Sequence, residues 1–485
     1  MYYIGADLGT SSLKMILTDD NMNIVNTAVA EYPLSFPNPG WSEQSPEDWW
    51  NAFLTVFADL TRNVDKSLIK GIGVAGQMHG LVVLDKDDNV IRPAILWNDG
   101  RTDKETEYLN TVIGKEKLSK LTANIAFAGF TAPKILWMKN NEPEKFSKIS
   151  KIMLPKDYIN YKLTGVHACD YSDASGMLLL DVENKCWSKE MIDICHIKEE
   201  MLPSLFESYE KIGTILPEMA DKLGISQNVA VSAGAGDNAG AAIGTGTIGE
   251  GKCNISLGTS GTIFISSEKF GVDENNALHS FCHADGGYHL MGCMLSAASC
   301  NKWFCDEVLK TKDYKGEQEN IQDDMLGKNN VYFLPYLMGE RSPINDTDAT
   351  GMFIGLRPDT NRYDMLLAVL EGVAFAIRDS LEVAKKLGIK IEKSTVCGGG
   401  AKSKLWMKIL ANVLNIELHI PKTEEGPGYG AAQLAKKACD NSYCFNQTEI
   451  KEVIMPDSEL SRLYQEKYDK FAKIYPSVKE LYKNI

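Results

Sequence analysis

The stretch that decides the fold lies near the middle of the chain: Val229-Ala-Val-Ser-Ala-Gly-Ala-Gly-Asp237-Asn238-Ala-Gly-Ala-Ala-Ile-Gly244. It opens with small and β-branched residues, which suit a buried strand. It closes with the alanine-rich run from Ala239 to Ile243, which suits a tightly packed helix. Asp237 therefore lies at a strand-to-helix corner, where small neighbours let a ligand come close and a helix N-terminus favours an ionised carboxylate. The pattern predicts a base or a metal ligand at this corner.

Two other interpretations of the corner are open. Asp237 or Asn238 could simply cap the helix without any chemistry. Alternatively, Gly234, Gly236 and Ala239 fit the G-x-G-x-x-A pattern of a dinucleotide loop after a strand. Against the dinucleotide loop, Asp237 would face and repel the pyrophosphate. The motif also asks for an acidic residue at a strand end about 20 positions on, and the sequence has no clear one.

Length and composition narrow the class of protein. A chain of 485 residues is comfortable for two domains, and 44% hydrophobic with 24% charged residues is usual for a globular protein. The net charge of −14 argues against nucleic acid and anionic membranes as partners. The eleven cysteines form no C-x-x-C pair, there is no apolar run of membrane-spanning length, and the first residues lack the basic start of a signal peptide. We therefore expect a cytoplasmic protein.

A hairpin pattern occurs twice. Residues 2–8 and 13–18 are predicted strands on either side of the turn Gly9-Thr10-Ser11-Ser12. The same strand, L-G-T-S turn and strand return in residues 254–266, where the turn is Gly258-Thr259-Ser260-Gly261.

The two hairpins align with an offset of 249 residues, about half the chain. Thr10 falls on Thr259, and Asp7 falls on Ser256, so only the first copy carries an acid. We interpret this as two similar domains, each opening with a turn whose N–H and hydroxyl groups can face phosphate. The alternative is a chance similarity of one short turn.

Other predicted strands also end in groups that could line a ligand site. The strand Lys70–Gly76 leads into Gln77-Met78-His79-Gly80, although a lone histidine is more often structural. The strand at 95–97 ends in Asn98-Asp99-Gly100-Arg101. The strand at 394–397 runs into Gly398-Gly399-Gly400-Ala401 and a helix at 402–413, which favours phosphate or nucleotide contact or, more plainly, a tight turn.

The remaining helices are predicted from periodicity. Residues 361–386 form the clearest amphipathic helix, with apolar residues at a spacing of three to four. Helices are also expected at 48–61 and 133–141. Residues 458–482 are expected to form a polar C-terminal helix interrupted near Pro476.

Three motif matches lack the context that their mechanisms require. Residues 246–252 have Walker spacing but end in Cys253, where a hydroxyl should hold magnesium. Residues 244–249 match G-x-G-x-x-G but precede a strand. The stretch His279-Ser-Phe-Cys282-His283 lacks a second pair at metal-ligand spacing.

Taken together, these loops resemble the FGGY carbohydrate kinases of the actin and sugar-kinase superfamily. Thr131–Trp137 and Gly351–Leu356 with Leu370–Phe375 are similar to the two signature regions of that family. Further similar stretches, which point to members that act on D-xylulose, are Gly76–Gly80, Ala94–Arg101, Leu154–Tyr158, Gly236–Asn238 and His279–His283. Ala6 departs from the larger apolar residue common in the family, and Ser403 from the Asn of some relatives.

The resemblance implies an α/β fold of two ribonuclease H-like domains, as in the actin and hexokinase superfamily, with a central cleft between them. Residues 1–247 would form the N-terminal domain with the sugar site and the catalytic base, and residues 248–440 the C-terminal, ATP-binding domain. Residues 441–485 would form a helical segment packed on the body.

The resemblance also implies an activity, namely transfer of the ATP γ-phosphoryl group to the 5-hydroxyl of D-xylulose. Asp237 would act as the base and Asp7 would organise Mg²⁺, through water. The residues assigned to the sugar are Met78, His79, Asp237 and Asn238. Those assigned to ATP are Thr10, Ser11, Ser12, Lys14, Gly258, Thr259, Gly399, Gly400, Ala401 and Ser403.

Other functions stay open at this point. Within the family, another sugar or polyol kinase such as a gluconokinase is the alternative. Outside it, an NAD-dependent oxidoreductase rests on the glycine motif before Asp237, and a non-catalytic actin-like or sugar-sensing protein is a third class. The expected partners are a small sugar and ATP, with a homodimer as one option for assembly.

Overall fold

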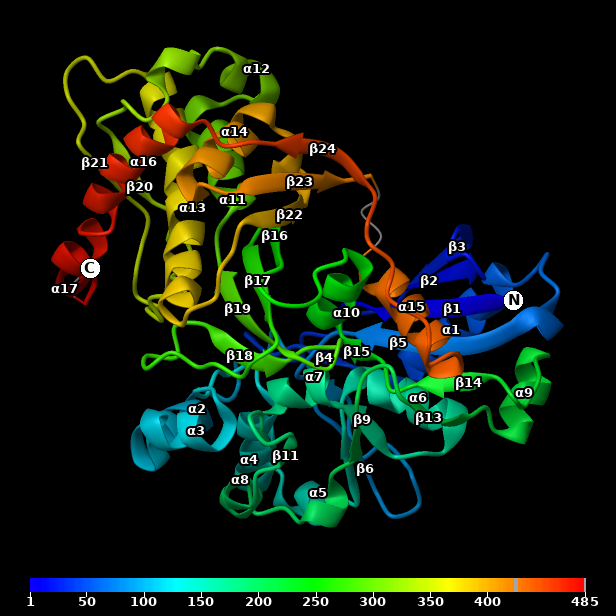
Figure 1. The fold of residues 1–485 in the computed structure, drawn as a ribbon. Coiled ribbons are helices and arrows are strands. Elements are labelled where there is room, and N and C mark those ends of the chain that lie inside the picture. Colours follow the sequence, from blue (N-terminus) through cyan, green and yellow to red (C-terminus); the bar gives the residue numbers. More distant parts are fainter. Residues whose placement is uncertain (423–425, 484–485) are drawn as a thin grey trace. The chain divides into compact units, whose positions relative to one another are not determined.

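The computed structural model describes residues 1–422 and 426–483. It divides into two compact units. Unit 1 contains residues 1–248, 280–288 and 426–447, and unit 2 contains residues 249–279, 289–422 and 448–483. Each unit is built from helices around a central sheet, so the predicted two-part α/β fold is confirmed (Figure 1).

Unit 1 is organised around a mixed sheet. Its main strands run in the order β13 (Lys211–Thr214), β14 (Ala230–Ser232), β5 (Ile69–Gly76), β1 (Tyr2–Leu8), β2 (Ser12–Asp19) and β3 (Ile24–Glu31). The hairpin β1–β2 is antiparallel, while β5 and β14 continue the sheet in parallel with β1. The predicted strands at 2–8 and 70–76 are therefore confirmed.

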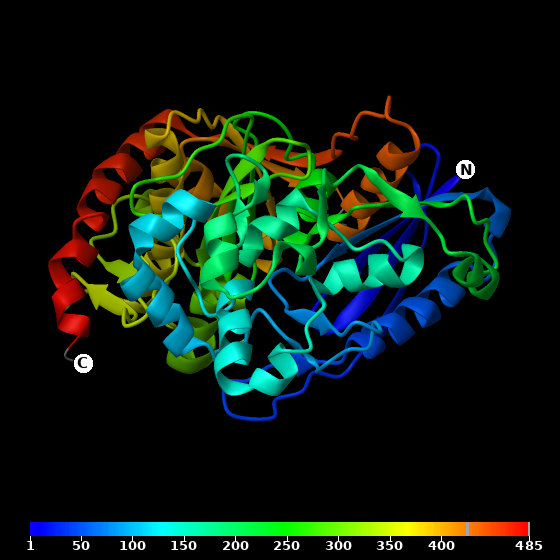
Figure 2. The same ribbon diagram turned by 90° about the horizontal axis from the view of Figure 1, so that it is seen from below.

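One face of this sheet is covered by the helix α1 (Pro46–Leu60), which lies alongside the strands (Figures 1 and 2). Alternate residues of β1 and β5, such as Ile4 and Val74, join the aromatic side chains Trp49 and Phe53 of α1 in one buried core. The strand period of two and the helical spacing of these apolar residues produce this layer.

The opposite face carries glycines where the helix α15 (Pro427–Cys439) lies directly on the strands. A Cβ added at Gly73 would lie 2.2 Å from the carbonyl oxygen of Ala431, and one at Gly5 would lie 1.9 Å from that of Gly428. The backbones of helix and sheet thus touch where larger side chains would separate them.

This packing places α15 in unit 1, because residues 426–447 cluster with the N-terminal sheet. The small-residue stripe of β1 and β5 is the physical reason, because it matches the small residues of α15. The predicted division into residues 1–247, 248–440 and 441–485 remains a prediction, as does the cleft.

The rest of unit 1 consists of short elements. The strand pairs are β4 (Glu43–Gln44) with β7 (Ala94–Ile95), β6 (Val82–Leu84) with β8 (Lys151–Met153), β9 (Ala168–Asp170) with β12 (Ser204–Phe206), and β10 (Leu180–Asp181) with β11 (Cys186–Trp187). The helices are α2 (Asp103–Tyr108), α3 (Lys115–Thr122), α4 (Thr131–Asn141), α5 (Pro143–Phe146), α6 (Pro155–Thr164), α7 (Tyr171–Ala174), α8 (Lys189–Ile194), α9 (Pro217–Leu223) and α10 (Asp237–Gly244). The strand predicted at 95–97 corresponds to β7, which is shorter than expected and ends at Ile95.

Unit 2 repeats the strand arrangement of unit 1. The hairpin β16 (Cys253–Leu257) and β17 (Gly261–Ser267) is antiparallel, and β22 (Lys393–Cys397) pairs with β16 in parallel. β23 (Glu417–Pro421) and β24 (Ile450–Ile454) extend the sheet beyond β22, and β19 (Tyr288–Met294) lies beyond β17. Both units therefore start with a hairpin whose first strand lies beside a parallel strand, as the sequence repeat predicts.

The core of unit 2 is centred on α13 (Arg362–Lys386), the predicted amphipathic helix. The side chain of Asn361 accepts hydrogen bonds from the N–H groups of Tyr363 and Asp364 and so caps its start. The other elements of unit 2 are α11 (Ala298–Trp303), α12 (Tyr314–Glu319), α14 (Lys404–Leu414), α16 (Ser458–Phe471), α17 (Ile474–Tyr482), β20 (Tyr332–Leu334) and β21 (Met352–Ile354). The strand β18 (His279–Cys282) pairs with β19.

The C-terminal segment packs on unit 2 through Tyr464 and Phe471, which are buried in the same core. The interruption expected near Pro476 lies slightly earlier, between α16 and α17. Pro476 itself stands in the first turn of α17, where its missing N–H has no intrahelical partner to lose.

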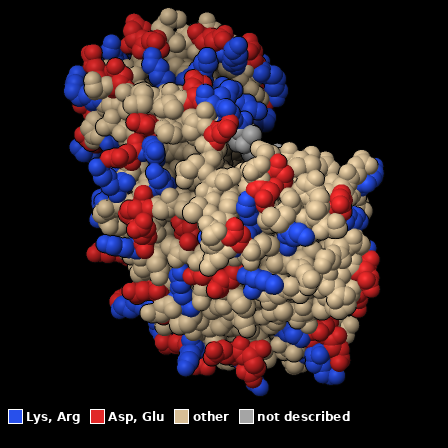
Figure 3. All heavy atoms as spheres, turned by 45° about the vertical axis from the view of Figure 1, so that its right-hand side comes forward, with Lys and Arg blue, Asp and Glu red and all other residues tan. Residues whose placement is uncertain are grey.

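The surface in Figure 3 carries charged side chains of both signs. On the face drawn in Figure 3, acidic and basic side chains are interspersed over much of the surface. Within the described residues, no helix is long and apolar enough to cross a membrane.

The contact between α15 and the sheet gives a test of the fold. We expect Gly73→Ala to lower the free energy of unfolding by about 1–3 kcal/mol, because its Cβ meets backbone that can yield only by separating the two layers. The matched control is Gly271→Ala, where the nearest atom would be 4.0 Å from the new Cβ. Urea denaturation followed by circular dichroism measures both, and equal midpoints for the two variants would contradict this packing.

Candidate functional site

The corner predicted from sequence is present in unit 1. The short strand β15 (Ala235–Gly236) pairs in parallel with the end of β5, where Gly236 lies opposite Gly76. α10 begins directly after it at Asp237, and Gly236 is the N-cap residue. Asp237 is thus the first residue of the helix, and Gly236 rather than Asp237 or Asn238 is the N-cap residue.

The hydrogen bonds to the Asp237 carboxylate both go to one of its two oxygens. Its Oδ1 accepts hydrogen bonds from the backbone N–H of Asn238 at 2.7 Å and from Asn238 Nδ2 at 2.9 Å. Burial raises the pKa of Asp237 to about 6, against the lowering effect of these two bonds. A carboxylate with this pKa is ionised at neutral pH and is a better proton acceptor than an exposed aspartate.

Met78 closes the corner from the next loop. A Cβ at Gly236 would lie 2.9 Å from both Cγ and Sδ of Met78, so a larger residue here would have to displace this side chain. Met78 is 4% exposed. The structure therefore places Met78 against Gly236, the residue before Asp237, and the role of Met78 in a sugar site remains a prediction.

His79 is fixed by its backbone as well as by its ring. Its φ of 69° lies in the left-handed region, and its carbonyl accepts hydrogen bonds from Lys134 Nζ at 2.8 Å and Thr131 Oγ1 at 3.1 Å. Since a carbonyl only accepts, the ring Nδ1–H donates to the carbonyl of Gly176 at 2.7 Å. In this tautomer Nε2 is an acceptor, which is suited to a sugar hydroxyl.

Lys134 was not assigned a role from sequence. Its ammonium also donates to the carbonyl of Gly129 at 2.7 Å, and burial lowers the pKa of this lysine well below its usual range. The available signal was a lysine amid the largely apolar Thr131–Trp137, the first turns of α4. Such a residue, fully buried, supports the loop that carries His79.

The first hairpin turn is also braced by neighbouring side chains. Within it, the N–H of Gly9 donates to the carbonyl of Ser12 at 3.0 Å. The Thr10 carbonyl accepts from Gln44 Nε2 at 2.6 Å, and the Thr10 hydroxyl accepts from Trp97 Nε1 at 2.9 Å. Ser11 is exposed at the tip, so the turn is fixed while its tip stays open to a ligand.

Asp7 lies just before this turn and pairs with Lys14 in the register of the β1–β2 hairpin. It is half-buried. The Tyr32 hydroxyl, which donates to the carbonyl of Gly9, has a raised pKa; burial is the larger cause and the negative charge of Asp7 is the second. A single carboxylate beside a phosphate-type turn suits Mg²⁺, which is usually held by one or two carboxylates together with substrate phosphates and water.

Within the described residues there is no cluster of three or more His, Cys, Asp or Glu side chains that could hold a metal ion. The stretch around His283 illustrates this, because its ring Nε2 donates to the carbonyl of Thr247 at 2.8 Å. A cation at Asp7 would therefore take most of its ligands from the nucleotide and from water.

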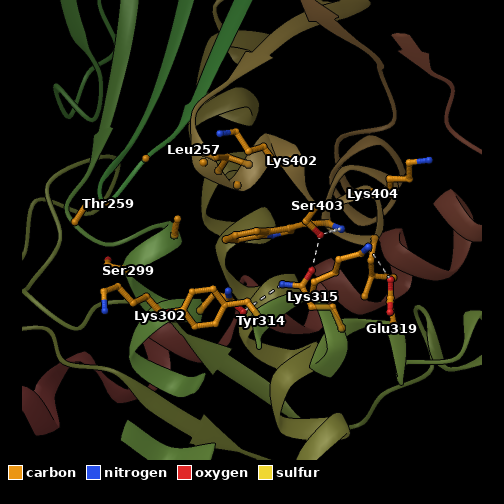
Figure 4. Close-up of a pocket in the computed structure, with 18 residues that line it drawn as sticks. Leu257, Thr259, Ser299, Lys302, Tyr314, Lys315, Glu319, Lys402, Ser403 and Lys404 are labelled. Carbon is orange, nitrogen blue, oxygen red and sulfur yellow. Dashed lines mark hydrogen bonds and ion pairs between the residues drawn. The ribbon is translucent and has the colours of Figure 1, made fainter. Parts of the chain in front are cut away.

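The second part of the predicted site is a pocket of about 980 Å³ in unit 2 (Figure 4). It includes the predicted residues Gly258, Thr259, Gly399, Gly400 and Ser403, and Trp406 forms part of its wall. Ala401 follows in the same turn but is not among the lining residues. Among the lining residues that sequence reasoning missed, one group lies on or near α11 and α12: Ala298, Ser299, Asn301, Lys302, Tyr314, Lys315, Gln318 and Glu319.

Ser403 has a structural role in this pocket. Its hydroxyl accepts the N–H of Trp406 at 3.0 Å, which caps α14, and donates to Gln318 Oε1 at 2.5 Å (Figure 4). Gln318 Nε2 in turn donates to Asn301 Oδ1 at 3.4 Å. These contacts link α14 to α11 and α12. No sequence pattern in residues 298–319 had predicted that this segment belongs to a site.

Comparison with known proteins identifies the family. The model of the N-terminal domain of the FGGY family of carbohydrate kinases matches residues 2–244, and that of the C-terminal domain matches residues 253–439. The chain belongs to the FGGY family of carbohydrate kinases. The resemblance noted in the sequence is confirmed, and this protein is a phosphotransferase of that family.

Individual relatives cover almost the whole chain. It is 39% identical to the xylulose kinase of Escherichia coli (strain K12) over 479 residues, 98% of each chain. A solved structure of a xyloylose kinase from Brucella ovis shares 38% identity and a TM-score of 0.95, covering 99% of this chain and 100% of that one. A gluconate kinase from Lactobacillus acidophilus shares 27% identity and a TM-score of 0.94 over 100% and 99% of the two chains.

The raised pKa of Asp237 gives a prediction about stability. The folded state binds the proton of the Asp237 carboxyl more tightly than the unfolded chain does, so the ionised carboxylate lowers the free energy of unfolding. This destabilisation is complete above about pH 6 and is lost as the pH falls toward the ordinary pKa of 3.8. Asp237→Asn keeps an oxygen for Asn238 and removes a charge that is partly buried. We expect it to raise the free energy of unfolding at pH 8, by at most about 3 kcal/mol for a shift of two pKa units.

Urea denaturation of wild type and variant at pH 8 and pH 5 measures this difference. The gain should shrink at pH 5, where the wild-type carboxyl is mostly protonated. A variant that is less stable than wild type at pH 8 would show that the ionised carboxylate is favourably solvated, contrary to the raised pKa.

Proposed function

We propose that this carbohydrate kinase transfers the γ-phosphoryl group of ATP to D-xylulose and forms D-xylulose 5-phosphate. The observation that carries the proposal is the Asp237 carboxylate, which has a raised pKa and stands at a helix start beside Met78. Two relatives that are xylulose kinases and are 39% identical over almost the whole chain support D-xylulose as the acceptor.

Asp237 is the base in this proposal. Its carboxylate accepts or orients the proton of the attacking sugar hydroxyl, and its raised pKa suits that role near neutral pH. Phosphoryl transfer passes through a loose transition state, so holding the hydroxyl in line contributes at least as much as removing its proton.

Met78, His79 and Asn238 form the sugar side of the site. The Asn238 side chain is committed to Asp237 through Nδ2, which leaves its Oδ1 as an acceptor for a hydroxyl. The His79 ring is oriented by its bond to Gly176 and stacks on Phe130 with centroids 4.7 Å apart, and in this proposal it contacts the sugar. Acceptors at fixed positions distinguish sugars by where their hydroxyl groups lie.

ATP is the second substrate, and the nucleotide residues remain as predicted from the family. Thr10, Ser11, Ser12, Lys14 and Thr259 would contact phosphates, while Gly399, Gly400 and Ala401 would contact the adenosine near the pocket of unit 2. Ser403 would act there through its link to Gln318. Asp7 would hold hydrated Mg²⁺, which when bound neutralises phosphate charge.

The alternative within the family is a gluconate kinase. It is favoured by the TM-score of 0.94 to such an enzyme from Lactobacillus acidophilus, although the xylulose kinases match at higher identity. The family assignment leaves the NAD-dependent oxidoreductase without support.

A coupled assay of ADP release over a panel of sugars tests the proposal. We expect D-xylulose to give the highest kcat/KM among ketopentoses, pentitols, glycerol and D-gluconate, with no NAD reduction in parallel samples. Preference for D-gluconate would support the alternative. Absence of sugar-dependent ADP release across the panel would contradict kinase activity on these substrates.

The role of Asp237 predicts the effect of Asp237→Asn on turnover. The amide is nearly isosteric but cannot accept the hydroxyl proton, and general-base assistance is typically worth about 10²–10⁴-fold. We expect kcat to fall by at least about 10²-fold, while calorimetry still detects binding of both substrates. A variant that keeps more than about a tenth of the wild-type kcat would place the base elsewhere.

The matched control for this loss is His79→Ala in the same site. Removing one hydrogen bond to a buried polar group costs about 1–3 kcal/mol, so the KM for the sugar should rise while the affinity for ATP stays near wild type. An unchanged sugar KM would show that His79 only supports the loop.

A further inference from the structure

A segment that the predicted site did not include lies directly behind Asp237. It runs from Asp170 through α7 to Gly176, and the side chains of Asp170, Ser172 and Asp173 are fully buried. The same segment contributes the Gly176 carbonyl that accepts the ring N–H of His79. Its contacts therefore reach both the proposed base and the proposed sugar residues.

The link to the base is the hydroxyl of Ser172. The backbone N–H of Gly236, the residue before Asp237, donates to Ser172 Oγ at 3.2 Å. Gly236 is the N-cap of α10, so this bond acts on the residue whose φ and ψ set the direction of the helix and of the Asp237 side chain. Gly236 is also fixed by its strand pairing with Gly76 and by its contact with the Met78 side chain, and the bond to Ser172 adds to these two.

The direction of the hydroxyl is set by Asp170. Because the amide of Gly236 can only donate, the Ser172 hydroxyl must give its own proton to another group, and Asp170 Oδ2 accepts it. The same carboxylate oxygen accepts the N–H of Ser172 at 2.9 Å and the hydroxyl of Ser208 at 2.7 Å. Three donors thus hold the carboxylate that orients the serine.

A buried lysine provides the opposite charge. Lys156 Nζ lies 2.9 Å from Asp170 Oδ1, 2.5 Å from Asp157 Oδ1 and 3.6 Å from Asp173 Oδ2, and all four side chains are at most 1% exposed. Charged groups buried at this depth are tolerated only when they are paired and hydrogen-bonded, which makes the arrangement rigid once it has formed. The chain from Lys156 through Asp170 and Ser172 to Gly236 therefore connects a fixed buried ion pair to the corner.

We propose that Ser172 is a positioning residue that acts through Gly236 to hold the Asp237 carboxylate in line with the attacking sugar hydroxyl. The inference rests on the proposed function, because it requires Asp237 to be the base. Ser172 itself touches neither substrate. Its effect should therefore appear in kcat, where the position of the base matters, and much less in the KM for the sugar or for ATP.

The test is Ser172→Ala, with Ser175→Ala as the matched control. Ser175 is equally buried and three residues away, but its hydroxyl donates to the Tyr171 carbonyl and accepts the N–H of Cys282, with no bond to the corner. We expect Ser172→Ala to lower kcat by about 10- to 100-fold, the scale of a small displacement of a catalytic group, with both KM values within about threefold of wild type. Ser175→Ala should keep a kcat within about twofold of wild type.

A double-mutant cycle with Asp237→Asn separates positioning from general damage. If Ser172 acts through Asp237, adding Ser172→Ala to Asp237→Asn should change the residual rate by less than about twofold. A loss by the same factor in both backgrounds, or a wild-type kcat for Ser172→Ala alone, would overturn the inference. If Asp237→Asn alone retains its kcat, the proposed function of Asp237 fails instead.

Ser172→Cys keeps the test decisive if the alanine variant does not fold. Cysteine has a similar shape but is a weaker donor and acceptor, so the bond to Gly236 weakens without leaving a void. Its kcat should also fall, and the fall should again vanish in the Asp237→Asn background. A cysteine variant with wild-type kcat would count against the proposal.

Discussion

The partly buried position of the Asp237 carboxylate is the constraint on which the site depends. Burial disfavours the ionised form and raises its pKa to about 6, and Asn238 offsets only part of that cost. An aspartate in this state keeps its position only if the backbone around it is rigid. The pairing of Gly236 with Gly76, the contact with Met78 and the bond to Ser172 provide that rigidity from three directions.

The same sheet that places Asp237 also places the hairpin turn before Ser12. β5 lies between β1 and the strands that lead to α10, so Asp7 on β1 and Gly236 on β15 both lie beside the same strand. α15 can cover this region closely because β1 and β5 present glycines such as Gly5 and Gly73 to it. A segment far along the sequence thereby becomes part of the unit that carries the proposed base.

Much of this arrangement could be predicted from local sequence. The strand-to-helix corner, both hairpins and the helix that follows Asn361 are encoded by patterns of small, β-branched and periodic apolar residues, and the structure contains each of them. The membership of α15 in unit 1 could not be predicted, because it depends on which distant backbone fits a stripe of small residues. The support from Lys134, Lys156 and Ser172 was also missed, since buried polar networks have no periodic signature and become visible only when their partners meet.

The position of the phosphate on the product tests the central claim most directly, because one fixed base should select one hydroxyl. The measurement is ³¹P–¹H correlation NMR of the product formed from D-xylulose and ATP, with ADP quantified in the same sample. The account predicts a single phosphate coupled to the two protons at C5, in one-to-one ratio with ADP. A phosphate at another carbon, a mixture of positions, or ADP formed without phosphorylated sugar would contradict it.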